Sequence, residues 1–208
     1  FSASLHTWES WVTNLKRDYR VISLDLPGHG LSRCMDNKEI GPAQFVETIN
    51  RVVNTLEIER FTLAGNSMGG SAAWNYALTH PERLEGLVLV DAAGWPRTET
   101  ETDERPLIFR LLEIDLARRV MQDLDLSSLI KGGLENSFGD PSFVTDEMVQ
   151  RYASLARAPC HREALLALTS SRDKRREATP EQLATITTPT LVMHGELDNL
   201  IPVEHGRQ

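Results

Sequence analysis

Residues 61–70, FTLAGNSMGG, constrain the fold more than any other part of the chain. A short apolar run leads into a serine that lies between glycines, and the residues that follow can form a helix. In the pattern G-x-S-x-G, a serine between a strand and a helix lies in a strained turn that exposes its hydroxyl. The pattern therefore predicts a strand over 61–65, a sharp turn at Ser67 and a helix that ends near Thr79.

Three further apolar runs, at residues 20–26, 86–94 and 189–195, are as short as the run at 61–65. None alternates polar with apolar positions, which is typical of parallel strands that are covered on both faces. Helix-length segments separate the first three runs, and the one at 42–56 carries apolar residues at helical spacing. The order predicts an α/β fold with a mostly parallel sheet flanked by helices.

Nearly a hundred residues separate the third run from the fourth, and most of them have helical patterns. Insertions in such sheets leave from the carboxyl ends of strands, where ligands bind. We therefore expect a helical cap at 96–186 over a core made of 1–95 and 187–208. The alternative is a helical subdomain that only completes the core. The helices are expected at about 105–121, 124–131, 145–157 and 161–171, with a loop at 132–142.

The composition narrows the classes of partner. A formal net charge of -8 disfavours binding to nucleic acid or to an anionic membrane, and the short basic run at 172–177 is interpreted as a solvated helix end. No apolar stretch reaches the 18 or so residues of a membrane helix. Cys34 and Cys160 are too few for a disulfide framework and are expected to be unpaired. A small-molecule substrate, no metal, no organic cofactor and a cytoplasmic location are expected.

Ser67 is the candidate nucleophile. The helix that begins at Met68 presents backbone N–H groups and a partial positive charge to an oxyanion that forms beside the serine. The alternative is a glycine-rich turn of a nucleotide-binding fold, although the spacing G-x-G-x-x-G of such sites is absent from this stretch.

A serine hydroxyl needs a base, and the base needs an acid that orients it. Asp198 follows the last apolar run, where the chain order Ser, Asp, His would place the acid, and Glu196 and Asp91 are weaker candidates. None of the six histidines follows a further strand after Asp198. His205 is expected to lie on a helix that points away from the serine, so the base is predicted to lie outside this chain.

At this point the sequence resembles the α/β-hydrolase fold family. Residues 5–32 are similar to its first helix, the following strand and its D-x-P-G-x-G-x-S loop, while LAGNSMGG resembles its nucleophile elbow and HGELDNLIP its acid loop. The resemblance implies strands before Phe1 and a histidine loop beyond Gln208. On that interpretation the chain is an internal fragment, which is expected to be poorly soluble and inactive alone. It also implies oxyanion donors at Met68 and at Phe1 or Ser2.

Because the nucleophile is Ser67 and not an aspartate, the epoxide hydrolase and haloalkane dehalogenase branches of the family are disfavoured. The expected function is a serine hydrolase of small or medium carbonyl substrates, with carboxylic esters first. The alternative within the family is a hydrolase that cleaves carbon-carbon bonds in aromatic ring-fission products. Asn66, Trp95 and Arg151 are candidate substrate-binding residues, although Arg151 also fits a solvated helix arginine. A third possibility, from another class, is a ligand-binding protein without catalysis.

Overall fold

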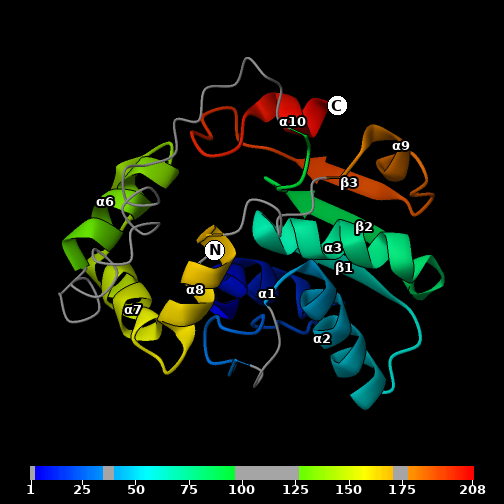
Figure 1. The fold of residues 1–208 in the computed structure, drawn as a ribbon, viewed down its shortest axis with the longest axis horizontal. Helices are drawn as coiled ribbons and strands as arrows, with labels where there is room; N and C mark the ends of the chain where they lie inside the picture. The colour runs from blue at the N-terminus through cyan, green and yellow to red at the C-terminus, as the bar shows by residue number, and fades with distance from the viewer. Residues whose placement is uncertain (1–2, 35–39, 97–126, 171–177) are drawn as a thin grey trace.

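The computed structural model describes residues 3–34, 40–96, 127–170 and 178–208. Within these residues the chain forms a three-stranded parallel sheet in the order β1-β2-β3 (Figure 1). The strands are β1 (Phe61–Asn66), β2 (Leu84–Val90) and β3 (Thr190–Met193). Asn66 pairs with Val90, and Val90 pairs with Met193, so the three strands end at the same level. The expected parallel α/β architecture is confirmed.

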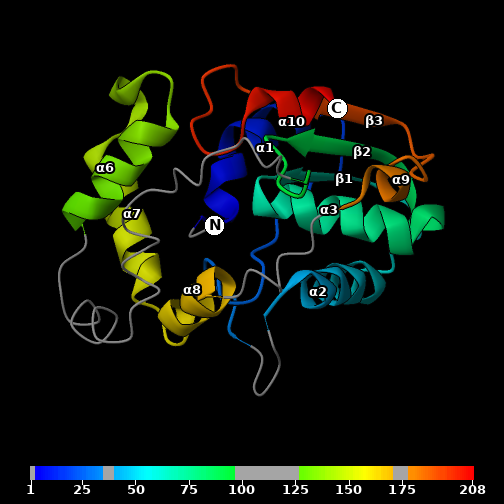
Figure 2. The same ribbon diagram turned by 45° about the horizontal axis from the view of Figure 1, so that its top comes forward.

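Two helices form layers on one side of this sheet. Helix α3 (Met68–Thr79) packs against β1 and β2, and α2 (Pro42–Thr55) packs against α3, as Figure 2 shows. Ala72, Ala73 and Tyr76 of α3 are almost fully buried, because this helix lies between the sheet and α2. The Tyr76 hydroxyl reaches Asn50 Oδ1 on α2 at 3.2 Å, which satisfies its polar end in the core.

The predicted strand at 20–26 is wrong. None of the described backbone hydrogen bonds joins residues 20–25 to another segment, and a strand exists only where a neighbouring strand completes its ladder. The segment instead leads to Asp25, whose buried carboxylate accepts the backbone N–H groups of Leu5 at 2.6 Å and Leu31 at 2.9 Å. Asp25 thereby fixes the loop to the first residue of η1 (Leu5–Trp8), which leads into α1 (Glu9–Leu15).

The helices between β2 and β3 largely match the expectation. The predicted helices at 145–157 and 161–171 are present, but a helix, α6 (Ser127–Ser137), extends through Ser137, so the predicted loop at 132–142 is wrong over its first half. The cost of two adjacent glycines is modest, and the ammonium of Lys131 lies 4.0 Å from Glu135 along the same helix. The described elements are α6 (Ser127–Ser137), η3 (Pro141–Phe143), α7 (Asp146–Ala156), α8 (His161–Ser170) and α9 (Pro180–Leu183).

The arrowheads of β2 and β3 point toward α6 and α7 in Figures 1 and 2, so these helices lie beyond the carboxyl ends of the strands. The predicted helix at 105–121 and the basic run at 172–177 lie outside the described residues. Among the helices that the structure describes, none has the length and apolar character needed to cross a bilayer.

Candidate active site

Ser67 occupies a strained turn between β1 and α3. Its backbone has φ 52° and ψ -116°, a conformation that residues other than glycine rarely adopt and that costs about 1–3 kcal/mol. Two neighbours hold it there: the Ser67 N–H donates to Val90 O at 2.9 Å, and its carbonyl accepts the Ala93 N–H at 3.0 Å. The Ser67 hydroxyl makes no capping hydrogen bond to α3. Among the described residues, the hydroxyl is therefore not tied to the amino end of α3.

Glycine is required at two positions around this turn. Only one of them, Gly65, belongs to the G-x-S-x-G motif. A Cβ on Gly65 would lie 2.2 Å from the Gly69 carbonyl oxygen, and a Cβ on Gly70 would lie 2.6 Å from the Ala92 Cβ. A Cβ on Gly69 would meet nothing within 4 Å. Close packing of β1 on α3 therefore requires glycine at 65, and close packing of α3 on the segment after β2 requires glycine at 70, whereas Gly69 has room for a side chain.

The predicted oxyanion donors fall into two groups. Helix α3 begins at Met68, so the Met68 N–H belongs to the first turn, whose N–H groups have no acceptor within the helix. Its position next to Ser67 supports the prediction without testing it. Phe1 and Ser2 lie outside the described residues.

The residues that follow the three strands meet at one edge of the sheet. Because Asn66, Val90 and Met193 are paired, the next residues, Ser67, Asp91 and His194, occupy equivalent positions. Neighbouring strands lie about 4.8 Å apart, which separates the backbones of the first and third by about 10 Å. The loop at 195–201 leaves from this edge and carries Asp198.

Asp198 is partly buried, with 17% of its side chain exposed. Its Oδ1 accepts the N–H groups of Leu200 at 2.7 Å and Ile201 at 3.0 Å, which orients the carboxylate within its own loop. Asp91 Oδ1 is committed to the Gly195 N–H at 2.8 Å, and Glu196 is exposed. These contacts favour Asp198 as the acid, which stays a prediction.

No hydrogen bond joins the Ser67 hydroxyl to an imidazole in the part of the chain that the structure describes. His29 is buried, and its Nδ1 lies 3.1 Å from the Pro27 carbonyl oxygen. Burial lowers the pKa of His29 from 6.5 to about 4. His80 stacks on Tyr76 beyond the carboxyl end of α3, the end remote from Ser67. The base outside residues 1–208 therefore remains a prediction.

Asp91, His194 and Asp198 are the described residues that could together hold a metal ion, since each offers one atom within 4.8 Å of the others. A metal would need the lone pair of His194 Nε2. That nitrogen instead lies 2.9 Å from the Ile201 carbonyl oxygen, which can only accept, so Nε2 carries a hydrogen. The arrangement is thus a hydrogen-bonded anchor for the loop at 195–201.

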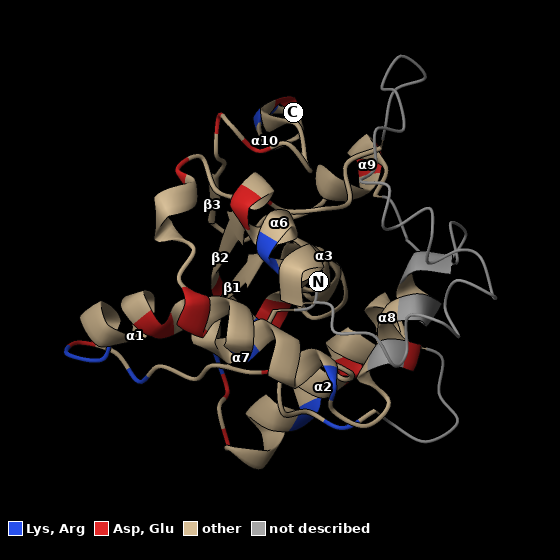
Figure 3. Cartoon of the chain, turned by 90° about the vertical axis from the view of Figure 1, so that its left-hand side faces the viewer, with Lys and Arg blue, Asp and Glu red and all other residues tan. Residues whose placement is uncertain are grey.

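Arg151 makes two ion pairs. Its Nη1 lies 3.3 Å from Glu9 Oε2 on α1, and its Nη2 lies 3.1 Å from Glu147 Oε1 on α7. Figure 3 shows acidic positions in red on both of these helices. These contacts tie α7 to α1 and favour the structural interpretation of this arginine over substrate binding.

Of the other two candidate substrate-binding residues, Asn66 directly precedes Ser67, and Trp95 lies in the segment that follows β2. The Asn66 side-chain amide donates to Val90 O at 3.3 Å, so it is held against the end of β2. Trp95 is partly buried and follows β2 by five residues. Between them, the Trp74 ring nitrogen on α3 donates to Ala93 O at 2.9 Å and fixes the segment that leads to Trp95.

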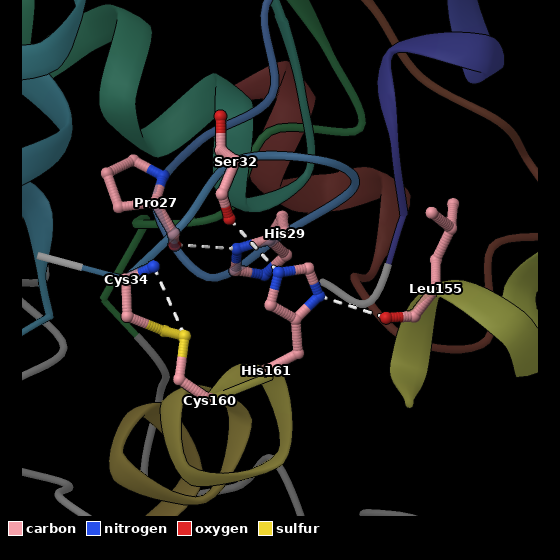
Figure 4. Close-up of a disulfide and its surroundings, with 7 residues drawn as sticks. All are labelled: Pro27, His29, Ser32, Cys34, Leu155, Cys160 and His161. Atoms are coloured by element: carbon pink, nitrogen blue, oxygen red, sulfur yellow. Dashed lines mark hydrogen bonds between the residues drawn. A yellow bond between two sulfur atoms is a disulfide. The ribbon is translucent and has the colours of Figure 1, made fainter. Parts of the chain in front are cut away.

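The expectation of unpaired cysteines is wrong, because Cys34 and Cys160 form a disulfide with Cα atoms 6.1 Å apart (Figure 4). The two cysteines are 126 residues apart, so no short spacing in the sequence indicates that they pair. His161 reinforces the junction: Nε2 lies 3.0 Å from Ser32 O, and Nδ1 lies 3.0 Å from Leu155 O. The loop that Asp25 fixes is thereby joined to α7 and α8.

The helices beyond the sheet also touch the loop that carries Asp198. The Asn199 side-chain amide donates to Asn136 O on α6 at 3.4 Å. A Cβ on Gly139 would lie 3.3 Å from Leu197 Cδ1, so the segment after α6 packs closely on the same loop. This contact supports a cap at 96–186 above the site, whose boundaries stay predictions.

The chain matches a family profile over its whole length and known proteins over nearly all of it. The sequence profile described as "alpha/beta hydrolase fold" matches residues 1–208. The chain is 29% identical over 207 residues to the 2-hydroxy-6-oxononadienedioate/2-hydroxy-6-oxononatrienedioate hydrolase of Comamonas testosteroni. It is 27% identical over 207 residues to the 2-hydroxy-6-oxo-6-phenylhexa-2,4-dienoate hydrolase of Burkholderia cepacia. Each match covers 96% of this chain and 69% of the relative.

Solved structures agree with this result. A hydrolase from Pseudomonas aeruginosa superposes with a TM-score of 0.73 at 28% identity, over 99% of this chain and 72% of that one. A meta-cleavage product hydrolase from Pseudomonas fluorescens superposes with a TM-score of 0.79 at 24% identity, over 99% of this chain and 72% of that one. The second similarity is one of fold.

Proposed function

This chain belongs to the α/β-hydrolase fold family, and we propose that it supplies the nucleophile and the acid of a serine hydrolase. The observation that carries the proposal is the backbone of Ser67, which is held at a positive φ by Val90 and Ala93 with its hydroxyl uncommitted to the helix. Strain of this kind persists where the surrounding structure maintains it, and it clusters at active sites. The named relatives are hydrolases, which supports an enzyme.

In the proposed reaction the Ser67 Oγ attacks a substrate carbonyl, and its proton passes to an imidazole base that we place outside residues 1–208. The oxygen that becomes negative accepts a hydrogen bond from the Met68 N–H, and Asp198 orients the base and stabilises its charge. Collapse breaks the bond to the leaving group, which takes the proton from the imidazole. Water then attacks the acyl group on Ser67 and regenerates the serine.

We propose carbon-carbon bond cleavage in a ring-fission product as the substrate class. Its support is the similarity to the Comamonas and Burkholderia relatives, whose names describe hydrolases of conjugated 2-hydroxy-6-oxo acids. A carbon leaving group departs readily only when conjugation spreads its negative charge, as the extended system in such acids allows. The acyl-enzyme on Ser67 is the same for this bond as for an ester.

Hydrolysis of a carboxylic ester is the second candidate, and the ion pairs of Arg151 favour it. A ring-fission acid carries a carboxylate that needs a cationic or hydrogen-bonding partner, because a buried charge without a partner is costly. The guanidinium of Arg151 is already engaged by Glu9 and Glu147. A neutral ester makes no such demand.

The test compares 4-nitrophenyl esters with a 2-hydroxy-6-oxo-dienoate as substrates for the protein as its gene encodes it. Ser67→Ala is expected to lower kcat on both by about a thousandfold or more. Ser71→Ala, one turn further along α3, is the matched control and is expected to keep full activity. The substrate with the higher kcat/KM identifies the bond that is cleaved.

If Ser67→Ala leaves turnover unchanged, the serine hydrolase proposal fails. If no substrate of either class turns over while these molecules raise the Tm of the unaltered protein, the non-catalytic ligand-binding interpretation replaces it.

A further inference from the structure

We propose that Asp91 and His194 are positioning residues for the catalytic acid. They would hold the loop at 195–201 so that one oxygen of Asp198 is fixed and the other stays available to the base. The inference rests on the proposed function, because that function gives Asp198 its part in the reaction. Neither residue needs to touch the substrate, and both act through Asp198.

Asp91 binds the chain on both sides of His194. Its N–H donates to Met193 O at 2.9 Å, which extends the β2-β3 ladder by one residue, and its Oδ1 accepts the Gly195 N–H at 2.8 Å. The backbone of Asp91 has φ 44°, a left-handed conformation that aspartate tolerates better than most residues. Asp91 therefore fixes the point at which the loop leaves the sheet.

His194 closes the same loop at its far end. Its side chain is only 5% exposed, and its Nε2 donates to the Ile201 carbonyl oxygen at 2.9 Å, so one ring spans the loop from first residue to last. The ring fits closely against α10 (Val203–Arg207), because a Cβ on Gly206 would lie 2.6 Å from His194 Nδ1. The loop is thus closed by a buried imidazole that has little room to move.

Asp198 lies inside the loop that these two residues close. Ile201 is held twice, by its N–H to Asp198 Oδ1 at 3.0 Å and by its carbonyl to His194, which couples the carboxylate to the ring. His194 Nε2 lies 3.8 Å from Asp198 Oδ2 and 4.0 Å from Asp91 Oδ1. Asp198 Oδ2 accepts no hydrogen bond from a described residue, so it is the oxygen that can receive the N–H of a catalytic imidazole.

The expected consequence is a loss in kcat without an equal change in KM. A displacement of about 1 Å at a catalytic group can cost about a hundredfold in rate. Asp91→Ala removes the acceptor for Gly195, and His194→Ala removes the donor to Ile201. Each is expected to lower kcat about tenfold to a hundredfold and to change KM by less than about threefold.

Conservative variants distinguish a role in positioning the loop by hydrogen bonds from a role of the side-chain charge at Asp91 and His194. Asp91→Asn keeps an oxygen that accepts the Gly195 N–H, and His194→Gln places an amide N–H near the position of Nε2. Both are expected to retain kcat within about threefold of the original. Two matched controls lie elsewhere: Asp140→Ala removes a carboxylate that accepts the Ser142 N–H at 2.9 Å, and His80→Ala removes a partly buried imidazole at the end of α3 remote from Ser67. Both controls are expected to keep full kcat.

The measurement is kcat per active site, with sites counted by covalent labelling of Ser67 with a fluorophosphonate. A purely structural role would reduce the number of labelled sites and the Tm but leave kcat per site unchanged, and that result would overturn the proposal. Gly206→Ala is the second variant in case the alanine variants do not fold. It crowds the His194 ring without removing a hydrogen-bonding group, and it is expected to lower kcat per site severalfold.

The outcomes for the two proposals are distinct. If Ser67→Ala remains active, the proposed function itself fails. If Ser67→Ala is inactive while Asp91→Ala and His194→Ala keep full kcat per site, only the positioning roles are refuted.

Discussion

Cys34 and Cys160 lie 126 residues apart in the chain and are joined by a disulfide between the loop after the D-x-P-G-x-G motif and the start of α8. A bond that closes so long a loop restricts the unfolded chain, and removing one of this kind costs about 2–4 kcal/mol. Cys160→Ser is therefore expected to lower the free energy of unfolding in urea by that amount. Reductant should destabilise the original protein equally and leave the double variant Cys34→Ser/Cys160→Ser unaffected. Equal stability with and without reductant in the original protein would contradict the bond.

The glycines of the elbow give a matched pair of variants. Gly70→Ala would place a methyl group 2.6 Å from the Ala92 Cβ and is expected to cost about 1–3 kcal/mol of unfolding free energy. Gly69→Ala meets nothing within 4 Å and is expected to gain about 0.5–1 kcal/mol, since alanine favours a helix over glycine. Urea denaturation measures both changes, and an equal effect of the two variants would contradict the close packing of Gly70 on Ala92.

Because His29 is buried, we expect the folded protein to lose stability in acid. Burial lowers its pKa to about 4 from 6.5, so the unfolded state binds a proton more readily than the folded state between these two values. Stability from this group is complete above pH 6.5 and falls as the pH drops toward 4, by about 3 kcal/mol at most. His29→Asn keeps a donor near Pro27 O but does not titrate, so its unfolding free energy should fall less from pH 7 to pH 4. Parallel pH curves for the two proteins would refute this.

A variant at Arg151 tests whether this arginine binds the carboxylate of a ring-fission acid. Because Glu9 and Glu147 occupy its guanidinium, Arg151→Gln is expected to leave KM for the dienoate within about twofold, with at most about 1 kcal/mol lost from the exposed ion pairs. Steady-state kinetics on the dienoate and a neutral ester measure this. A KM that rises tenfold or more for the acid alone would show that Arg151 turns to the substrate carboxylate.

A structural feature could be predicted from the sequence when the residues that form it are contiguous in the chain. The turn at Ser67 was predictable because the apolar run, the glycines and the helix that form it are contiguous. The strand at 20–26 was wrongly predicted, since a strand depends on a partner that its own residues do not encode.

The long-range contacts that hold the site together could not be predicted from the sequence. Two such contacts form where distant segments meet, and no spacing along the chain indicates them. One is the disulfide between Cys34 and Cys160, and the other is the set of hydrogen bonds by which Asp91 and His194 hold the loop at 195–201. The sequence alone marks Asp91 only as a weak candidate for the acid. Its position immediately after a strand, like that of His194, was the one signal that could have placed both at the edge where Ser67 lies.

The most direct test of the account is to identify the residue that becomes acylated. The protein is quenched in acid within milliseconds of mixing with a 4-nitrophenyl ester, digested and analysed by mass spectrometry. The account predicts the added acyl mass on the peptide that contains Ser67, and its absence in Ser67→Ala but not in Ser71→Ala. Product release without acylation of Ser67, or an acyl group on another residue, would contradict it.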